Sequence, residues 1–536
     1  MLLVFFFAIF HGTRAAAKPN IIVIVADDLG WNDVGFHGSN QIPTPNIDAL
    51  AYSGIIMNNY YVMPVCTPSR AALMTARHPI HTGMQHDVIF ANEPWGLSLN
   101  EKLLPQYLKE QGYVTRAVGK WHLGHFQRNY TPMYRGFDSH YGYWGGHQDY
   151  YDHTAQDSRR YWGYDMRRNM KVSRKDSLGR YTTRLFTDEA VSVIRKHNTR
   201  RPLFLYLAHL AVHSANPYLP LQAPQEEVAN LLDQSVGAVV AALDLRGMLQ
   251  NSIIVFTSDN GGPAGGFNLN AASNWPLRGV KDTIWEGGTR GAAFIWSPLL
   301  RNTPRVSTQL AHIQDWLPTV MTAINATLPS EVAAKLDGKD IWAALNDPAK
   351  PTYQELLIAI DKERNYAALR RGQWKLLEGT TWNGNYDVVI GPAGREGQYN
   401  MSDVFASPAA RAIARTTRPL PSDTTITRLR RKATVTCAKE DPSRLCIAKH
   451  GKPCLFNIQN DPCESRNVAG VYSTVFSSML AALKVHAATV VPARNQPADP
   501  ASNPKYWDYT WTNWYDYPRP PALPHNHTFA PSVTYV

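Results

Sequence analysis

Three apolar runs along the chain are each followed within a few positions by polar or ionisable side chains. Residues 21–25 and 253–256 are rich in β-branched side chains, and residues 203–210 form a third run. Such runs are typical of strands buried on both faces of a parallel sheet. Because ligand sites in these sheets lie at the carboxyl ends of the strands, the pattern predicts an α/β fold with its site there. The polar residues at these ends are Asp27, Asp28, His213, Asp259 and Asn260.

Helical spacing of apolar residues recurs in four segments that fit between the predicted strands. These segments are residues 46–53, 99–111, 187–197 and 228–245. We therefore expect one large α/β domain over residues 18–346, with helices that flank the sheet.

From about residue 347 the pattern changes. Residues 366–377 alternate between apolar and polar around Arg371-Gly372, which predicts a β-hairpin. Residues 473–488 again have helical spacing. We expect a smaller domain with an antiparallel sheet over residues 347–490, packed on the first. Residues 491–536 are rich in Pro, Trp and Tyr and predict an irregular tail over the surface or near the cleft.

The composition excludes some classes of protein. With 44% hydrophobic and only 18% charged residues, a chain of 536 residues is not largely disordered. The net charge of +11 favours an acidic partner such as nucleic acid, an anionic membrane or a sulfated polysaccharide. No long Lys/Arg run or nucleic-acid motif is present, which argues against nucleic acid.

The first residues predict export from the cytosol. Residues 2–10 are apolar and lead to Ala15-Ala16-Ala17, so we expect a signal peptide over residues 1–17. The run is too short to span a bilayer, and no other segment is long enough. We expect no membrane span and a location in the secretory pathway, either the lysosome or the extracellular space. Sequons for N-glycosylation occur at Asn129, Asn325, Asn400 and Asn526.

The cysteines fit an oxidising compartment. Four of the five lie between residues 437 and 463, and an even number suits two disulfides. We expect the pairs Cys437–Cys446 and Cys454–Cys463, and a zinc site is the alternative use of these four side chains. Cys66 is the odd cysteine.

Cys66 begins a stretch with a pattern suited to catalysis. It precedes Thr67-Pro68-Ser69-Arg70 and a mostly apolar, helix-forming run. Thr67 is predicted to be the N-cap of a helix and Pro68 its first residue. Cys66 would then lie at the positive end of the helix, with Arg70 one turn along, where a nucleophile could attack an anionic ester. The alternative is that Cys66 is a small buried apolar residue.

Two other groups of residues suggest a charged site. Asp27, Asp28, Asp259 and Asn260 offer only oxygen ligands, which suit Ca²⁺ or Mg²⁺, although such pairs also serve as turns and helix caps. The segment 119–122, Gly-Lys-Trp-His, supplies a cation and a titratable base two residues apart. On an extended segment Lys120 and His122 would point the same way. Surface or packing positions are the alternative for both.

Together these motifs resemble the sulfatase family. Cys-x-Pro-Ser-Arg followed by Leu and Thr matches its activation motif, in which a separate formylglycine-generating enzyme oxidises the cysteine to formylglycine. Ala76 stands where that family usually has Gly. The resemblance covers residues 19 to about 317, including 26–30, 119–124 and 259–262. It implies an alkaline-phosphatase-like fold with a mixed, mainly parallel sheet. Further matches at residues 81–85, 275–279, 285–288 and 454–458 are similar to the arylsulfatase B group, that is, N-acetylgalactosamine-4-sulfatases with their arylsulfatase I and J relatives.

The resemblance also implies the role of each site residue. Formylglycine at position 66 is the catalytic group, Arg70 supports its hydroxyls, and one hydroxyl, activated by a single Ca²⁺ and by Asp259, attacks sulfur. His213, with Lys281, protonates the leaving alcohol, and His122 takes the proton of the second hydroxyl. Lys120 and Lys281 stabilise charge on the sulfuryl oxygens. The metal ligands implied are Asp27, Asp28, position 66, Asp259 and Asn260.

The implied substrates are aryl sulfates or sulfated glycosaminoglycan sugars of the N-acetylgalactosamine 4-sulfate type. Two alternatives stay open at this point. A phosphoesterase of the same superfamily usually has Ser or Thr as nucleophile and further His/Asp ligands for a second metal, and Ala72 is not the Arg that a cysteine phosphatase needs. The other alternative is a glycan-binding protein without catalysis, which Ala76 and a shortened segment suggest. Residues 213–259 are about a dozen shorter than in close relatives, with the gap near residues 225–232.

Overall fold

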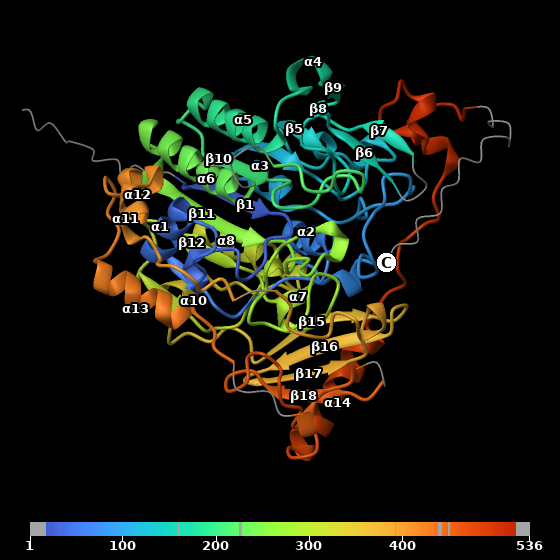
Figure 1. The fold of residues 1–536 in the computed structure, drawn as a ribbon. Helices are drawn as coiled ribbons and strands as arrows, with labels where there is room; N and C mark the ends of the chain where they lie inside the picture. Colours follow the sequence, from blue (N-terminus) through green and yellow to red (C-terminus); the bar gives the residue numbers. More distant parts are fainter. Residues whose placement is uncertain are drawn as a thin grey trace, which may run out of the picture.

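A ten-stranded mixed sheet forms the centre of the computed structural model, which describes residues 18–157, 161–223, 228–391, 393–437, 442–448 and 451–520 (Figure 1). The predicted signal peptide, Asn526 and part of the shortened segment near residue 225 lie outside the described residues. In sheet order the strands are β13 (Arg305–Ser307), β2 (Ile55–Met57), β12 (Ala293–Trp296), β11 (Ser252–Ser258), β1 (Asn20–Ala26), β10 (Leu203–Ala208), β4 (Val114–Lys120), β5 (Ser139–Tyr143), β8 (Arg167–Arg168) and β9 (Lys171–Val172).

The middle of this sheet is parallel, as the apolar runs predict. β1 pairs in parallel with β10 on one side and with β11 on the other, and β4 and β5 continue the parallel part beyond β10. β12 is antiparallel to both β11 and β2. The predicted fold class, a mixed and mainly parallel sheet, is confirmed.

Helices cover both faces of the sheet because successive strand residues point to opposite sides. Ile22 and Ile24 of β1 pack into one apolar core, and Ile21 and Val23 pack into the other. The first core is covered by α1 (Pro45–Ser53), α5 (Thr182–Lys196), α6 (Val228–Leu245), α11 (Met401–Ala406), α12 (Pro408–Ile413) and α13 (Asp423–Ala433), and the second by α2 (Cys66–Thr75), α3 (Leu104–Glu110) and α8 (Trp316–Ala323).

Two helices differ in length from the prediction. α3 begins at Leu104 instead of residue 99, because Pro105 occupies the first turn and Leu103 is extended before it. α5 begins at Thr182, five residues earlier than predicted, and its buried face includes Leu185 and Phe186.

A four-stranded antiparallel sheet lies below the large sheet in Figure 1, as expected for the later part of the chain. Its strands are β15 (Glu355–Asp361), β16 (Tyr366–Arg371), β17 (Trp374–Glu378) and β18 (Cys454–Asn457), and α14 (Ser473–Ala488) packs on it. The predicted hairpin is confirmed between β16 and β17, and its turn is Gly372-Gln373, because Arg371 still pairs with Trp374. Residues 401–433 pack against the large sheet's helices, although they fall inside the range predicted for the smaller domain.

The remaining elements are short. They are β3 (Tyr60–Tyr61), β14 (Ala311–His312), β6 (Thr154–Gln156), β7 (Trp162–Tyr164), α4 (Arg174–Ser177), α7 (Glu286–Thr289), α9 (Ser330–Ala333) and α10 (Trp342–Asn346). The tail after residue 491 runs along one side of the molecule from α14 to the β6–β7 hairpin, drawn in red in Figure 1. Trp511 and Trp514 are buried there. In the described part of the chain, the helices are too short or too polar to cross a membrane.

The predicted disulfide pairing is wrong. The bonds are nested, Cys437–Cys463 outside and Cys446–Cys454 inside. Cys446 and Cys454 pack in the apolar cluster of the small sheet, whereas Cys463 packs against Trp31 and Leu277 of the large domain. Because each bridge serves a different cluster, the order of the cysteines in sequence does not give the pairing. All four cysteines are used, which excludes the zinc alternative.

Removal of the outer bridge is expected to cost more stability than removal of the inner one. The outer bridge spans 26 residues and the inner one 8, so loop-closure entropy gives losses of about 3.5 and about 2.5 kcal/mol. Denaturant unfolding of the two double Cys→Ser variants measures both values. An inner-bridge variant that is less stable than the outer-bridge variant would contradict the nested arrangement.

Candidate active site

Three carboxylates and three cations meet at the carboxyl ends of β1 and β11. Asp27 and Asp28 follow β1, Asp259 and Asn260 follow β11, and all four side chains are fully buried. Each carboxylate has its own cation within hydrogen-bonding distance. The pairs are Lys120 Nζ–Asp27 Oδ2 at 2.6 Å, Arg70 Nη2–Asp259 Oδ2 at 2.7 Å and Lys281 Nζ–Asp28 Oδ1 at 2.8 Å. Buried charges of this kind persist only when they are paired or bind a metal.

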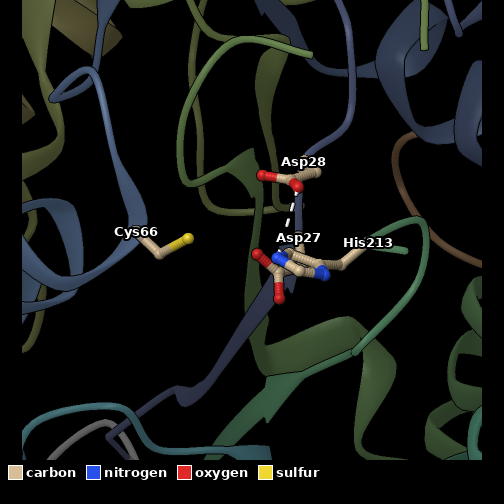
Figure 2. Close-up of side chains that lie close together, drawn as sticks. All are labelled: Asp27, Asp28, Cys66 and His213. Atoms are coloured by element: carbon tan, nitrogen blue, oxygen red, sulfur yellow. Dashed lines mark ion pairs between the residues drawn. The ribbon is translucent and has the colours of Figure 1, made fainter. Parts of the chain in front are cut away.

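Cys66 lies beside these carboxylates at the start of α2 (Figure 2). The helix begins at Cys66 itself, with Val65 extended before it, so the predicted cap at Thr67 is wrong. The hydroxyl of Thr67 instead accepts from the Ile89 amide and donates to the His122 carbonyl. Cys66 therefore sits in the first turn of a buried helix, where the peptide dipoles favour negative charge.

The backbone at the end of α2 explains why the family that the sequence resembles usually has Gly at the position of Ala76. Ala76 closes the helix in the left-handed conformation, with φ 56° and ψ 21°. A Cβ atom makes this conformation costly, so Gly is the favoured residue at such a position. Ala76 is fully buried, and its carbonyl accepts from the amides of Asp337 and Gly338.

One ligand atom each from Asp27, Asp28, Cys66 and His213 lies within 4.8 Å of the others, and Figure 2 shows how they converge. His213 Nε2 is 3.5 Å from Asp28 Oδ2, and its Nδ1 donates to the Ser214 carbonyl at 2.6 Å. The carbonyl acceptor fixes the proton on Nδ1, which leaves Nε2 facing the carboxylate.

His122 also reaches this site, but by a different geometry from the one predicted. Lys120 ends β4, whereas His122 is left-handed with φ 61°, so the segment is not extended through both residues. Nε2 of His122 lies 3.0 Å from the Ile89 carbonyl, and its buried Nδ1 has no hydrogen-bond partner among the described residues. The ring is therefore oriented with Nδ1 free of any hydrogen bond to the described residues.

Burial controls protonation in the cluster. It raises the pKa of the Cys66 thiol to about 12, despite the nearby lysines. Burial lowers the pKa of His122 well below its ordinary value, and Lys120 adds to this effect. Burial would raise the pKa of Asp28, but Lys281 and His213 outweigh it and lower that pKa to about 2.

The oxygen atoms of the cluster fit a hard divalent cation. Among the described residues, Asp27 Oδ1 and Asn260 Oδ1 are buried without any hydrogen-bond partner. Unpartnered buried oxygens are costly, and carboxylate and amide oxygens are the ligands that Ca²⁺ prefers. The chemistry of the donors and the two orphaned oxygens thus agree with a calcium site.

The sequence analysis did not identify some residues that lie at or near this site. The Tyr206 hydroxyl of β10 lies 3.3 Å from Arg70 Nη1, but this tyrosine falls inside an apolar run that gave no signal. Arg364 bridges Asp87 and Asp282, next to Lys281, from the turn between β15 and β16. It comes from the smaller domain, so only the tertiary fold brings it there. His147 stacks on His213 and directly follows two glycines, which was a usable signal.

Comparison of this chain with known proteins identifies one family. The sequence profile described as Sulfatase matches residues 19–326. Arylsulfatase J of Mus musculus is 36% identical over 526 residues, covering 94% of this chain and 81% of that protein. N-acetylgalactosamine-6-sulfatase of Homo sapiens is 32% identical over 360 residues, covering 62% of this chain and 66% of that protein.

A similar solved structure is the crystal structure of Ps i-CgsB in complex with k-i-k-neocarrahexaose. It has a TM-score of 0.67 and 26% identity, and the match covers 91% of this chain and 97% of the other.

Proposed function

The chain belongs to the sulfatase family and is a sulfatase, and from this premise we propose that Cys66, as formylglycine, is its catalytic group beside one Ca²⁺. The observation that carries the proposal is the convergence of Cys66 with Asp27 and Asp28 in a buried, cation-rich cluster. A sulfate ester is an anion, so its cleavage needs positive charge around the sulfuryl oxygens.

Formylglycine and Ca²⁺ have defined places in this proposal. Formylglycine at position 66 would supply the attacking hydroxyl, and a Ca²⁺ held by position 66 and the oxygens of Asp27, Asp28, Asp259 and Asn260 would supply a Lewis acid. The unmodified thiol is the starting point for a formylglycine-generating enzyme, which is the partner we propose for maturation.

The chain's own residues supply charge and protons. The Lys120 and Lys281 ammonium groups, which donate to Asp27 and Asp28 in the cluster, would hold the sulfuryl oxygens. His213 Nε2 faces the cluster. Because the Ser214 carbonyl accepts the Nδ1 proton, a proton for the leaving alcohol would come from Nε2 of the imidazolium, which Asp28 Oδ2 at 3.5 Å favours. His122 Nδ1 has no partner in the described part of the chain and can accept a proton as the general base. Arg70 fixes Asp259 through two hydrogen bonds.

The substrate class we propose is sulfated saccharides of the N-acetylgalactosamine 4-sulfate type, with aryl sulfates as small substrates. The names of the relatives N-acetylgalactosamine-6-sulfatase and arylsulfatase J support sulfated amino sugars and aryl sulfates as substrates. The similar structure of Ps i-CgsB was solved in complex with k-i-k-neocarrahexaose. The net charge of +11 suits an anionic polymer. The two disulfides support a secretory location, lysosomal or extracellular.

Sulfate release tests this proposal. We expect the calcium-loaded protein, produced with the maturation enzyme, to hydrolyse p-nitrophenyl sulfate and disaccharides that carry N-acetylgalactosamine 4-sulfate. The assay runs at pH 5 and pH 7, with the 6-sulfated disaccharide and p-nitrophenyl phosphate as comparisons. Faster hydrolysis of the phosphate than of the sulfate would favour the phosphoesterase alternative, and absence of all turnover would favour the glycan-binding one.

A further inference from the structure

One loop touches both catalytic histidines. A Cβ atom placed on Gly146 would lie 2.8 Å from the His122 ring, so this glycine allows the close approach of the loop. The next side chain, His147, stacks on His213, with ring centroids 5.9 Å apart and planes inclined by 13°. In the proposed reaction His213 faces the leaving alcohol, so the surface that continues from His147 lies on the leaving-group side.

Buried hydrogen bonds fix the segment that follows His213. The Tyr150 hydroxyl donates to the His213 carbonyl at 2.8 Å. Asp149 accepts from the Asn216 amide at 3.0 Å and from the Tyr218 hydroxyl. The segment from His213 to Tyr218 is thus fixed alongside residues 149–150. Five residues reach at most about 17 Å, which keeps Tyr218 within a few sugar lengths of the site.

The outer end of this surface carries two exposed aromatic rings. Tyr218 is 58% exposed and Trp162, the first residue of β7, is 38% exposed. Their ring centroids are 5.3 Å apart with planes inclined by 43°. Because Asp149 holds the Tyr218 hydroxyl, the ring is fixed before any ligand binds, and fixed aromatic rings lose little entropy on binding. We call His147, Trp162 and Tyr218 the aromatic wall, and the buried Tyr150 supports it from behind.

We propose that the aromatic wall is a saccharide subsite that binds the sugar units next to the sulfated one, on the leaving-group side. This inference rests on the proposed function and deepens it. Both outer rings are neutral, and the carboxylate behind them, Asp149, would repel a second anion. The faces of a sugar ring combine apolar C–H groups with peripheral hydroxyls, which suits amphipathic rings of this kind. The wall therefore predicts that the enzyme prefers an oligosaccharide to an isolated sulfate ester.

The first experiment compares two substrates in Trp162→Ala and Tyr218→Ala proteins. The substrates are a tetrasaccharide that carries N-acetylgalactosamine 4-sulfate and p-nitrophenyl sulfate, which lacks any sugar. We expect the ratio of kcat/KM for the tetrasaccharide to kcat/KM for the aryl sulfate to fall about tenfold in each variant, chiefly through KM. Tyr472→Ala is the matched control, since Tyr472 is 45% exposed and packs on Trp374 in the smaller domain. It should leave that ratio unchanged.

The second experiment separates this inference from the proposed function. Calorimetry measures tetrasaccharide binding to Cys66→Ala protein, with and without Trp162→Ala, so no turnover is needed. We expect about tenfold weaker binding with the second substitution. If binding weakens in this way but the wild type cleaves no sulfate ester, the proposed function is wrong and the saccharide subsite is still supported. Equal tetrasaccharide affinity with and without Trp162→Ala would overturn the proposed saccharide subsite; this is the result expected if the rings bind a protein partner. An unchanged ratio of kcat/KM in the first experiment would overturn it as well.

Discussion

Cys66→Ala protein is expected to lose sulfate release by about 10⁴-fold or more, because removal of a nucleophile leaves only the contribution of the surrounding charges. The cations and carboxylates of the cluster stay in place, since the Cys66 side chain is not needed for their three ion pairs. The measurement is the initial rate of p-nitrophenyl sulfate hydrolysis with Ca²⁺ present.

The control for this variant is a neighbouring buried residue of the same helix. Met74→Leu conserves the volume of a buried side chain in α2 and should keep activity within a few-fold. Thermal unfolding of both variants separates loss of chemistry from loss of fold. A Cys66→Ala protein that still releases sulfate at more than about a hundredth of the wild-type rate would refute the assigned nucleophile.

Asp259→Asn is expected to lower the free energy of unfolding by about 3–5 kcal/mol and to remove activity. The side chains of Arg70 and Asp259 are both fully buried and 2.7 Å apart, so the substitution leaves a buried guanidinium that only Asp27, at 3.7 Å, still faces among the described carboxylates. Denaturant unfolding measures the stability change. Asp188→Asn, which removes the partner of Arg180 in an exposed pair, should cost about 1 kcal/mol or less.

The same variant tests the calcium site. A ligand that binds only the folded state raises the melting temperature, so Ca²⁺ should stabilise the wild type and fail to stabilise Asp259→Asn protein. EGTA should reverse the effect in the wild type. A melting temperature of the wild type that does not respond to Ca²⁺ would argue against this ligand set.

The sheet was predictable because burial on both faces requires uninterrupted apolar residues. β1, β10 and β11 match their predicted runs, and the residues that follow them meet at one edge. Since the carboxyl ends of neighbouring parallel strands lie side by side, the order of apolar runs and acidic residues is enough to bring Asp27, Asp28 and Asp259 together. The helix α6, with its regular apolar spacing, was likewise predicted at its observed bounds.

The features that were predicted wrongly depend on contacts between residues that are distant in sequence. The start of α2 was misplaced because the Thr67 hydroxyl serves Ile89 and His122, which are distant in sequence, instead of capping its own helix. The disulfide pairing was predicted wrongly because the cysteines pack in two different apolar clusters. Cys446 and Cys454 lie in the cluster of the small sheet, and Cys463 lies in the cluster with Trp31. His122 was predicted to be extended, but its left-handed backbone turns the ring toward the Ile89 carbonyl.

Mass spectrometry of the peptide that contains Cys66 tests the central claim most directly. The protein is produced together with a formylglycine-generating enzyme, and its sulfatase activity is measured on the same sample. Formylglycine at position 66, in a fraction that rises with specific activity, is the predicted result. Full activity in a sample whose position 66 is entirely unmodified thiol would contradict the account.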